Sequence, residues 1–133
     1  MGIHHAQLKD NTLQLLPCDK LDNVNIQVND LHFDPKIRKL FIGAFQRGIM
    51  VYDMKTKMVT QPEVSLKDVS ISRIKPLNAK ELLIATDGGG IYKMNVETYQ
   101  TEPFIVADYN SYNGMNGNSI NDIYIDEEGR IWM

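Results

Sequence analysis

The residues best suited to chemistry form a polar loop, Asp108-Tyr109-Asn110-Ser111-Tyr112-Asn113-Gly114. An EF-hand calcium loop beginning at Asp108 would need an acid or amide at 112, glycine at 113 and glutamate at 119. Tyr112, Asn113 and Ser119 occupy those positions, so this calcium chemistry is not expected. Tyrosine rings can stack on the C–H face of a sugar, and asparagine amides can donate to and accept from hydroxyls. Two interpretations stay open: a plain polar connection, or a loop that contacts a saccharide.

A second candidate is the glycine run Gly88-Gly89-Gly90, which follows a strand-like apolar segment. A dinucleotide-binding fingerprint starting at Gly88 would need glycine or alanine at position 93, where the chain has Lys93. The residues that follow are also strand-like, so no helix N-terminus is available for a phosphate. The run therefore predicts a tight turn with positive φ.

The sequence indicates no catalytic residue, metal ligand or cofactor. His4 and His5 are adjacent and would point to opposite faces of a strand, and Cys18 is the only cysteine. No histidine or cysteine spacing suits zinc, and no serine stands in a glycine-flanked elbow. We therefore do not expect this chain to be an enzyme.

The bulk composition points to an ordinary folded domain. The 133 residues are 43 % hydrophobic and 23 % charged, with a net charge of −3, which argues against nucleic acid as a partner. No apolar stretch approaches the ~18 residues of a membrane span, so no membrane contact is expected. The first residues also lack the pattern of a signal peptide.

The elements that would position these residues belong to a repeat. Segment 40–49 has a counterpart 42 residues later at 82–91 and a partial one at 131–133. Each is preceded by a segment in which apolar and polar residues alternate, the pattern of a half-buried strand. These preceding segments are 28–33, 71–75 and 120–125. A period in the forties with several strands per unit is typical of the blades of a β-propeller.

We label the four strands of a blade a to d in chain order. The chain is then predicted to be all-β, a single partial β-propeller domain over 1–133 with about three four-stranded blade equivalents. It is expected to start and end in the middle of a blade. The predicted parts are strands c and d at 1–16, full blades at 24–61 and 69–105, and strands a and b at 119–133.

In a propeller, the b–c turns and the d–a connections emerge on the same face. The loop at 106–118 should therefore neighbour the turns at 45–47 and 86–89. The residues of this face are candidates for ligand binding. They are Phe45, Gln46, Arg47, Asp87, Tyr109, Tyr112, Asn113 and Asn116.

The amino-acid sequence of the repeat resembles that of a known family, the two-component regulator propeller. The resemblance is carried by Asn118-Ser119-Ile120-Asn121-Asp122-Ile123-Tyr124-Ile125-Asp126-Glu127-Glu128-Gly129-Arg130-Ile131-Trp132 and by Leu83-Ile84-Ala85-Thr86-Asp87-Gly88-Gly89-Gly90-Ile91-Tyr92. The segment Ala44-Phe45-Gln46-Arg47 departs from it, because the family usually has threonine and glycines there. The resemblance implies the periplasmic sensor region of a hybrid two-component histidine kinase, whose usual ligands look like oligosaccharides.

Two other functions stay open, a structural or protein-interaction propeller without a small-molecule ligand and a fragment of a propeller enzyme. Strand b at one end and strand c at the other would each leave an unpaired edge, and such edges recruit partners. We therefore also expect self-association, with strands c and d of one chain completing strands a and b of another in a homodimer.

Overall fold

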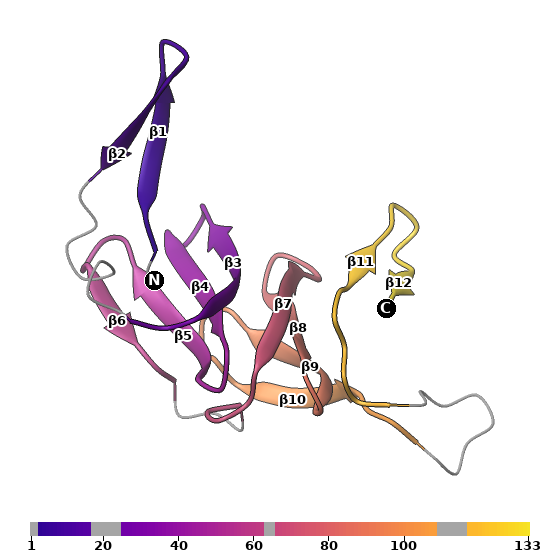
Figure 1. Ribbon diagram of the computed structural model, residues 1–133. Coiled ribbons are helices and arrows are strands. Elements are labelled where there is room, and N and C mark those ends of the chain that lie inside the picture. The colour runs from indigo at the N-terminus through magenta and orange to yellow at the C-terminus, as the bar shows by residue number, and fades with distance from the viewer. Residues whose placement is uncertain (1–2, 17–24, 63–65, 109–116) are drawn as a thin grey trace.

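A computed structural model describes residues 3–16, 25–62, 66–108 and 117–133 of the chain. Its regular elements are antiparallel β-strands, and they form two four-stranded and two two-stranded sheets (Figure 1). No helix in the described ranges has the length and apolar character needed to cross a membrane. The prediction of an all-β chain with four-stranded units is confirmed.

The two four-stranded sheets are complete blades with the same order of strands. Blade 1 contains β3 (Val28–Asp34), β4 (Lys39–Ala44), β5 (Gly48–Asp53) and β6 (Met58–Thr60). Blade 2 contains β7 (Ile71–Pro76), β8 (Glu81–Thr86), β9 (Gly90–Asn95) and β10 (Thr101–Ile105). In each blade every strand pairs with the next along the chain, as strands a to d of a propeller blade do.

The two-stranded sheets lie on either side of these blades. One is a hairpin of β1 (His5–Lys9) and β2 (Thr12–Leu16), and the other joins β11 (Tyr124–Ile125) to β12 (Ile131–Trp132) (Figure 1). The first strand of the second pair is shorter than the predicted segment 120–125. Ile120, the first residue of the predicted segment, contacts blade 2 instead, since its N–H donates to the Thr86 carbonyl.

Short polar side chains close the hairpin turns. A side-chain oxygen at the first turn position accepts backbone N–H groups two to four residues later, an Asx turn that offsets the cost of reversing the chain. These residues are Asp34, Asp53, Asn78, Asn95 and Asp126. At Asp53, the N–H groups of Lys55 and Thr56 hold the pKa of the carboxyl below its usual value.

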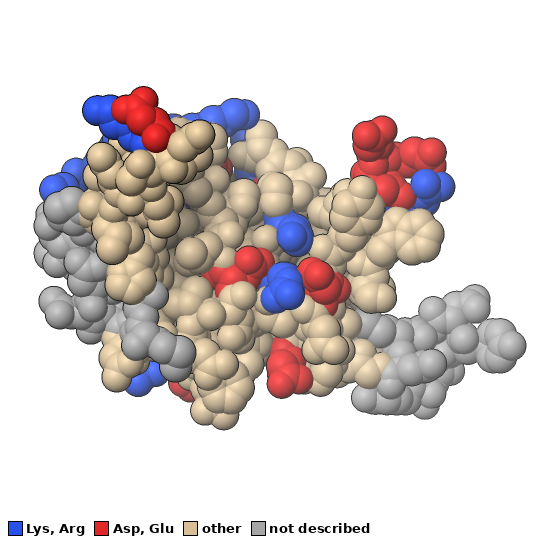
Figure 2. All heavy atoms as spheres, turned by 45° about the horizontal axis from the view of Figure 1, so that its top comes forward, with Lys and Arg blue, Asp and Glu red and all other residues tan. Residues whose placement is uncertain are grey.

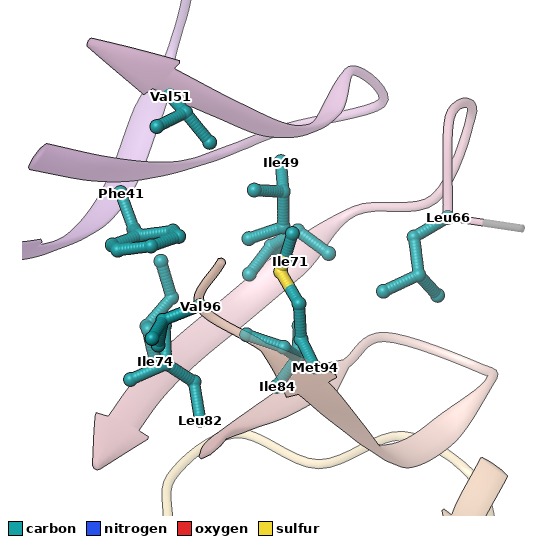
Figure 3. Close-up of a cluster of buried hydrophobic side chains, with 10 residues drawn as sticks. All are labelled: Phe41, Ile49, Val51, Leu66, Ile71, Ile74, Leu82, Ile84, Met94 and Val96. Carbon is teal, nitrogen blue, oxygen red and sulfur yellow. The ribbon is translucent and has the colours of Figure 1, made fainter. Parts of the chain in front are cut away.

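The core consists of three apolar layers, one between the complete blades and one on the outer side of each. Because side chains alternate along a strand, β4 points Phe41 toward blade 2 and Ile42 to the opposite side. Both residues are fully buried, so both faces of the sheet are covered. Figure 3 shows the central layer, where side chains from the two blades meet. It contains Phe41, Ile49, Val51, Leu66, Ile71, Ile74, Leu82, Ile84, Met94 and Val96.

A β-bulge at the start of strand a supplies a polar link between blades. The pairing register shifts at Asn29 in β3 and at Ser72 in β7. The Asn29 amide donates to the Ile71 carbonyl over 2.9 Å, and the Ser72 hydroxyl donates to the Ile120 carbonyl in the same way. The same hydrogen bond thus recurs at two successive junctions.

The b–c turn of each blade is also held by the segment that leads into the next blade. The Gly48 N–H donates to the Val69 carbonyl over 2.9 Å, and the Gly90 N–H donates to the Asn118 carbonyl over 2.8 Å. Both glycines have positive φ, at 67° and 81°. A Cβ atom on Gly48 would lie 2.1 Å from the Leu66 carbonyl oxygen, so only glycine lets the two segments approach.

We predict that Gly48→Ala destabilises the fold by about 2 kcal/mol or more, because it combines left-handed strain with a backbone clash. Gly88→Ala is the matched control: its φ is 95°, but a Cβ atom there would meet no atom within 4 Å. Urea denaturation of the two variants measures the difference in free energy of unfolding. Equal losses for both would show that the approach to Leu66 does not matter.

A second prediction concerns a carboxylate that joins the two blades. Asp30 Oδ2 accepts the N–H of Ile74, a residue only 3 % exposed, over 2.8 Å. Asp30→Ala leaves that amide without its partner and should cost about 1–3 kcal/mol in urea denaturation. The control is Asp122→Ala at the equivalent repeat position, where the carboxylate meets the partly exposed Arg73 side chain and the loss should be smaller. A larger loss at Asp122 would contradict this assignment.

Candidate functional site

The two b–c turns of the complete blades are linked by a single residue, Ser70. Its hydroxyl oxygen accepts the N–H of Gln46 over 3.1 Å, and its carbonyl accepts the N–H of Asp87 over 2.9 Å. Ser70 lies immediately before β7, so it is fixed by the strand that starts blade 2. One serine therefore sets the position of the turn of blade 1 relative to the turn of blade 2.

A related contact occurs one blade later, where Ser119 holds the repeat position of Ser70 and its hydroxyl also bonds to the preceding b–c turn. The Ser119 hydroxyl donates to Asp87 Oδ1 over 2.7 Å. The neighbouring Asn118 carbonyl accepts the N–H groups of Gly88 and Gly90, and its amide oxygen accepts the N–H of Ala107. The d–a connection and the b–c turn are thus side by side at this junction, as the propeller geometry predicts.

These contacts define a polar arc, the set of Gln46, Ser70, Asp87 and Ser119. Gln46, Asp87 and Ser119 are exposed, and Ser70 is half-buried between the turns. Their side chains offer an amide, two hydroxyls and a carboxylate along one edge of the molecule. Such groups suit a ligand rich in hydroxyl groups, because each can accept a hydrogen bond and three can also donate one.

Two larger side chains flank the polar arc. Phe45 is 42 % exposed and Arg47 is exposed, both in the b–c turn of blade 1. The Arg47 backbone is anchored, since its carbonyl accepts the Gln61 amide over 2.6 Å. An aromatic ring next to hydrogen-bonding groups is the combination that contacts the apolar and polar faces of a sugar.

The predicted site residues can now be placed. Phe45, Gln46, Arg47 and Asp87 all lie in the two b–c turns. Tyr109, Tyr112, Asn113 and Asn116 lie outside the described residues, so their part in the site stays a prediction. Sequence reasoning missed Ser70 and Ser119. The signal was available, because a serine directly precedes the isoleucine at the start of strand a in both repeats, in Val69-Ser70-Ile71 and in Asn118-Ser119-Ile120.

A depression of about 480 Å³ lies next to the polar arc and shares Ser119 with it. Asp122, in the wall of this depression, forms an ion pair with Arg73, with 3.0 Å between Asp122 Oδ1 and Arg73 Nε. The Ile123 N–H, together with the nearby Arg73 charge, holds the pKa of the Asp122 carboxyl below its usual value. The lining residues are Gly117, Ser119, Ile120, Asn121, Asp122 and Met133.

Within the described ranges, no group of three or more His, Cys, Asp or Glu side chains could hold a metal ion. The buried side-chain nitrogen and oxygen atoms of these ranges all have hydrogen-bond partners.

Comparison with known proteins places this fold. No protein-family model and no curated protein sequence matches the chain. Two solved structures of the extracellular domain of BT4673 from B. thetaiotaomicron do match it. In one, described as a one-component system, the identity is 25 % and the TM-score 0.66, over 91 % of this chain and 16 % of that one. In the other, described as a hybrid two-component system, they are 22 % and 0.68, over 98 % and 18 %.

The chain thus spans less than one fifth of the length of the structures that it matches. Both alignments cover nearly all of it. The resemblance expected from the repeat motifs is confirmed: the chain is a β-propeller segment similar to part of the extracellular domain of a hybrid two-component system.

Proposed function

We propose that this chain is a segment of the extracytoplasmic ligand-sensing propeller of a hybrid two-component signalling protein, and that its polar arc binds an oligosaccharide. The similarity to an extracellular domain of a hybrid two-component system supports the location and the signalling context. The signalling output would lie in other parts of such a protein.

The observation that carries the proposal is the double contact made by Ser70. Because Ser70 accepts the backbone N–H of Gln46 in one turn and the backbone N–H of Asp87 in the next, the backbones of these two turns are held in a fixed relation. Pre-arranged donors and acceptors lose little conformational entropy when a ligand binds. An extended chain of sugar units, with hydroxyl groups along its length, is a ligand that could contact several such groups at once.

Phe45 adds the apolar part of the proposed contact. Its ring is nearly half exposed although it is large and apolar, and it stands next to Gln46 of the polar arc. A sugar placed on the ring would bury the C–H face while its hydroxyl groups reach the amide. The predicted tyrosines and asparagines of the loop 109–116 would extend the same surface.

The test is calorimetric titration of the chain with cellohexaose, xylohexaose and mannohexaose, with the single sugars as comparison. For the hexasaccharide that binds, Phe45→Ala and Asp87→Ala should each weaken affinity about tenfold or more, since a stacked ring or a charged hydrogen bond contributes roughly 1.5–3 kcal/mol. Asp87→Asn, which keeps an acceptor for Ser119, should lose less.

Two control variants match these changes in size and exposure. Phe33→Ala removes a ring of 46 % exposure from the end of β3, next to the a–b turn of blade 1, and Glu97→Ala removes an exposed carboxylate from the c–d turn of blade 2. Both should leave the affinity unchanged, because a–b and c–d turns emerge at the opposite end of a blade from the b–c turns. If the controls weaken binding as much as Phe45→Ala does, the polar arc is not the site. Absence of binding to all three sugars would favour the propeller without a small-molecule ligand.

A further inference from the structure

We propose that the a–b and c–d turns of blade 1 form a second binding surface, a basic rim that binds an anionic polysaccharide through its carboxylate or sulfate groups. The basic rim is the set of Lys36, Arg38, Lys55 and Lys57, all of which are exposed. It lies at the opposite end of the blade from the polar arc, so the inference goes beyond the proposed function. Only the choice of a polysaccharide among polyanions rests on the proposed extracytoplasmic location.

Positive charge is concentrated in these two turns although the whole chain is acidic. The segments 34–39 and 53–57 contain five of the 14 basic residues and only two acidic ones, whereas the chain has a net charge of −3. Figure 2 shows basic side chains along the upper edge of the molecule on the side of blade 1. Acidic side chains gather at the extremity where Figure 1 places β11 and β12. The basic rim is therefore a local feature and does not follow from the overall composition.

The two acidic side chains of these turns bond to the backbone. Oδ1 of Asp34 and Oδ1 of Asp53 each accept two backbone N–H groups of their own turn, over 2.7 to 3.3 Å. In the described part of the chain, no ion pair joins Lys36, Arg38 or Lys55 to a carboxylate. The charged groups of these three side chains are therefore available to an anionic ligand.

The two turns lie side by side, so their charges act together. The Met54 N–H in the c–d turn donates to the Arg38 carbonyl in the a–b turn over 3.0 Å. Within the c–d turn, the Lys57 N–H donates to the Asp53 carbonyl over 2.8 Å. Two adjacent, hydrogen-bonded turns thus carry the four basic side chains, and one anionic chain that lies across them can contact both turns.

Blade 2 shows that the fold does not require this charge. Lys55 and Glu97 hold the same turn position, since each donates its N–H to the side chain of the capping residue two positions earlier. Lys57 and Tyr99 also correspond, because each donates its N–H to the carbonyl of that capping residue. The turn needs the oxygen atoms of the cap and not a basic side chain. The basic residues of blade 1 therefore need another explanation.

Two residues of the basic rim have a backbone conformation in which glycine would be less strained. Arg38 and Lys57 both have a φ of 56°, in the left-handed region. Gly129, which holds the repeat position of Arg38 in the turn between β11 and β12, has a φ of 78°. Strained residues of this kind are often found at ligand-binding sites. A role in binding explains why long basic side chains stand where glycine would cost less.

The composition of this surface favours a polyanion over a protein or a membrane. The exposed residues of the turns 35–38 and 54–57 are Pro35, Lys36, Arg38, Lys55, Thr56 and Lys57. None of them is a large apolar residue. Protein interfaces are depleted in lysine and have an apolar core, and firm binding to a membrane surface adds apolar insertion to basic charge. A chain of acidic sugars, with an anionic group on successive units, matches a row of basic side chains.

The first test is calorimetric titration with dextran sulfate and polygalacturonate, with dextran as the neutral comparison. Both polyanions should bind and dextran should not. Raising NaCl from about 50 to about 200 mM should weaken the binding about tenfold, because contacts between exposed charges are screened and counterions are released. Equal binding of dextran, no binding of either polyanion, or an affinity that salt leaves unchanged overturns the proposal. Tighter binding to phosphatidylglycerol vesicles overturns the choice of a polysaccharide.

The second test locates the contact with a reversal of charge. Lys55→Glu should weaken the affinity for dextran sulfate about fivefold or more. The fold should tolerate this change, because blade 2 has Glu97 at the same turn position. Lys67→Glu is the matched control, an exposed lysine beside Gly48 and thus at the b–c end of blade 1. Equal weakening by the two variants would show that binding follows net charge alone, which overturns the site.

A third comparison separates the basic rim from the polar arc. The double variant Lys36→Glu/Lys55→Glu should lose at least about tenfold in affinity for dextran sulfate with unchanged circular dichroism, and should still bind the neutral hexasaccharide as the unmodified chain does. Phe45→Ala should leave the affinity for dextran sulfate unchanged. A double variant that still binds dextran sulfate, or a Phe45→Ala variant that loses it, overturns the basic rim as a separate site. If no neutral hexasaccharide binds, the proposed function fails while the dextran sulfate result stands.

Discussion

The fold depends on one constraint: a blade of this protein cannot be completed without the segment that leads into the next blade. The N–H groups of Gly48 and Gly90 lie at the start of strand c, and their acceptors, Val69 and Asn118, come before the following strand a. The apolar layers obey the same rule, because strands b and c carry large residues on both faces. The apolar residues on each face of a sheet are thus buried only when a neighbouring element covers that face.

The contacts that satisfy this constraint also shape the candidate site. Ser70 and Ser119 occupy equivalent places, and each bonds to the b–c turn of the blade before it. Ser70 therefore contributes both to the junction between blades and to the exposed row of polar groups. At these positions the contacts that join the blades also place the groups of the proposed ligand site, whereas Phe45 and Arg47 project from the turn.

The sequence predicted most of the fold because the strand pattern of a complete blade occurs twice along the chain. The repeat segment 40–49 was recognisable from its apolar residues and from the glycine before strand c, and it contains most of β4 and the start of β5. The predicted segment 120–125 is longer than β11, because only Tyr124 and Ile125 pair with β12. Strand pairing depends on the partner strand and not on local alternation. Of the polar arc, the sequence predicted Gln46 and Asp87 but not Ser70 and Ser119. Turn residues stand out by their composition, but the role of Ser70 comes from contacts 17 and 24 residues away in the chain.

The two half blades show how the same sequence rules act without a neighbour. An isolated two-stranded hairpin is only marginally stable in water. Every residue of β1–β2 is exposed except Leu16 at its end, which is half-buried. Its leucines nevertheless keep the strict alternation of the buried strands, with Gln7 and Gln14 on the other face. A hairpin selected only for exposure would not need three leucines on one face, since each exposed large side chain adds to the risk of non-specific association. The pattern is therefore the one that a neighbouring blade would cover, as the complete blades cover each other.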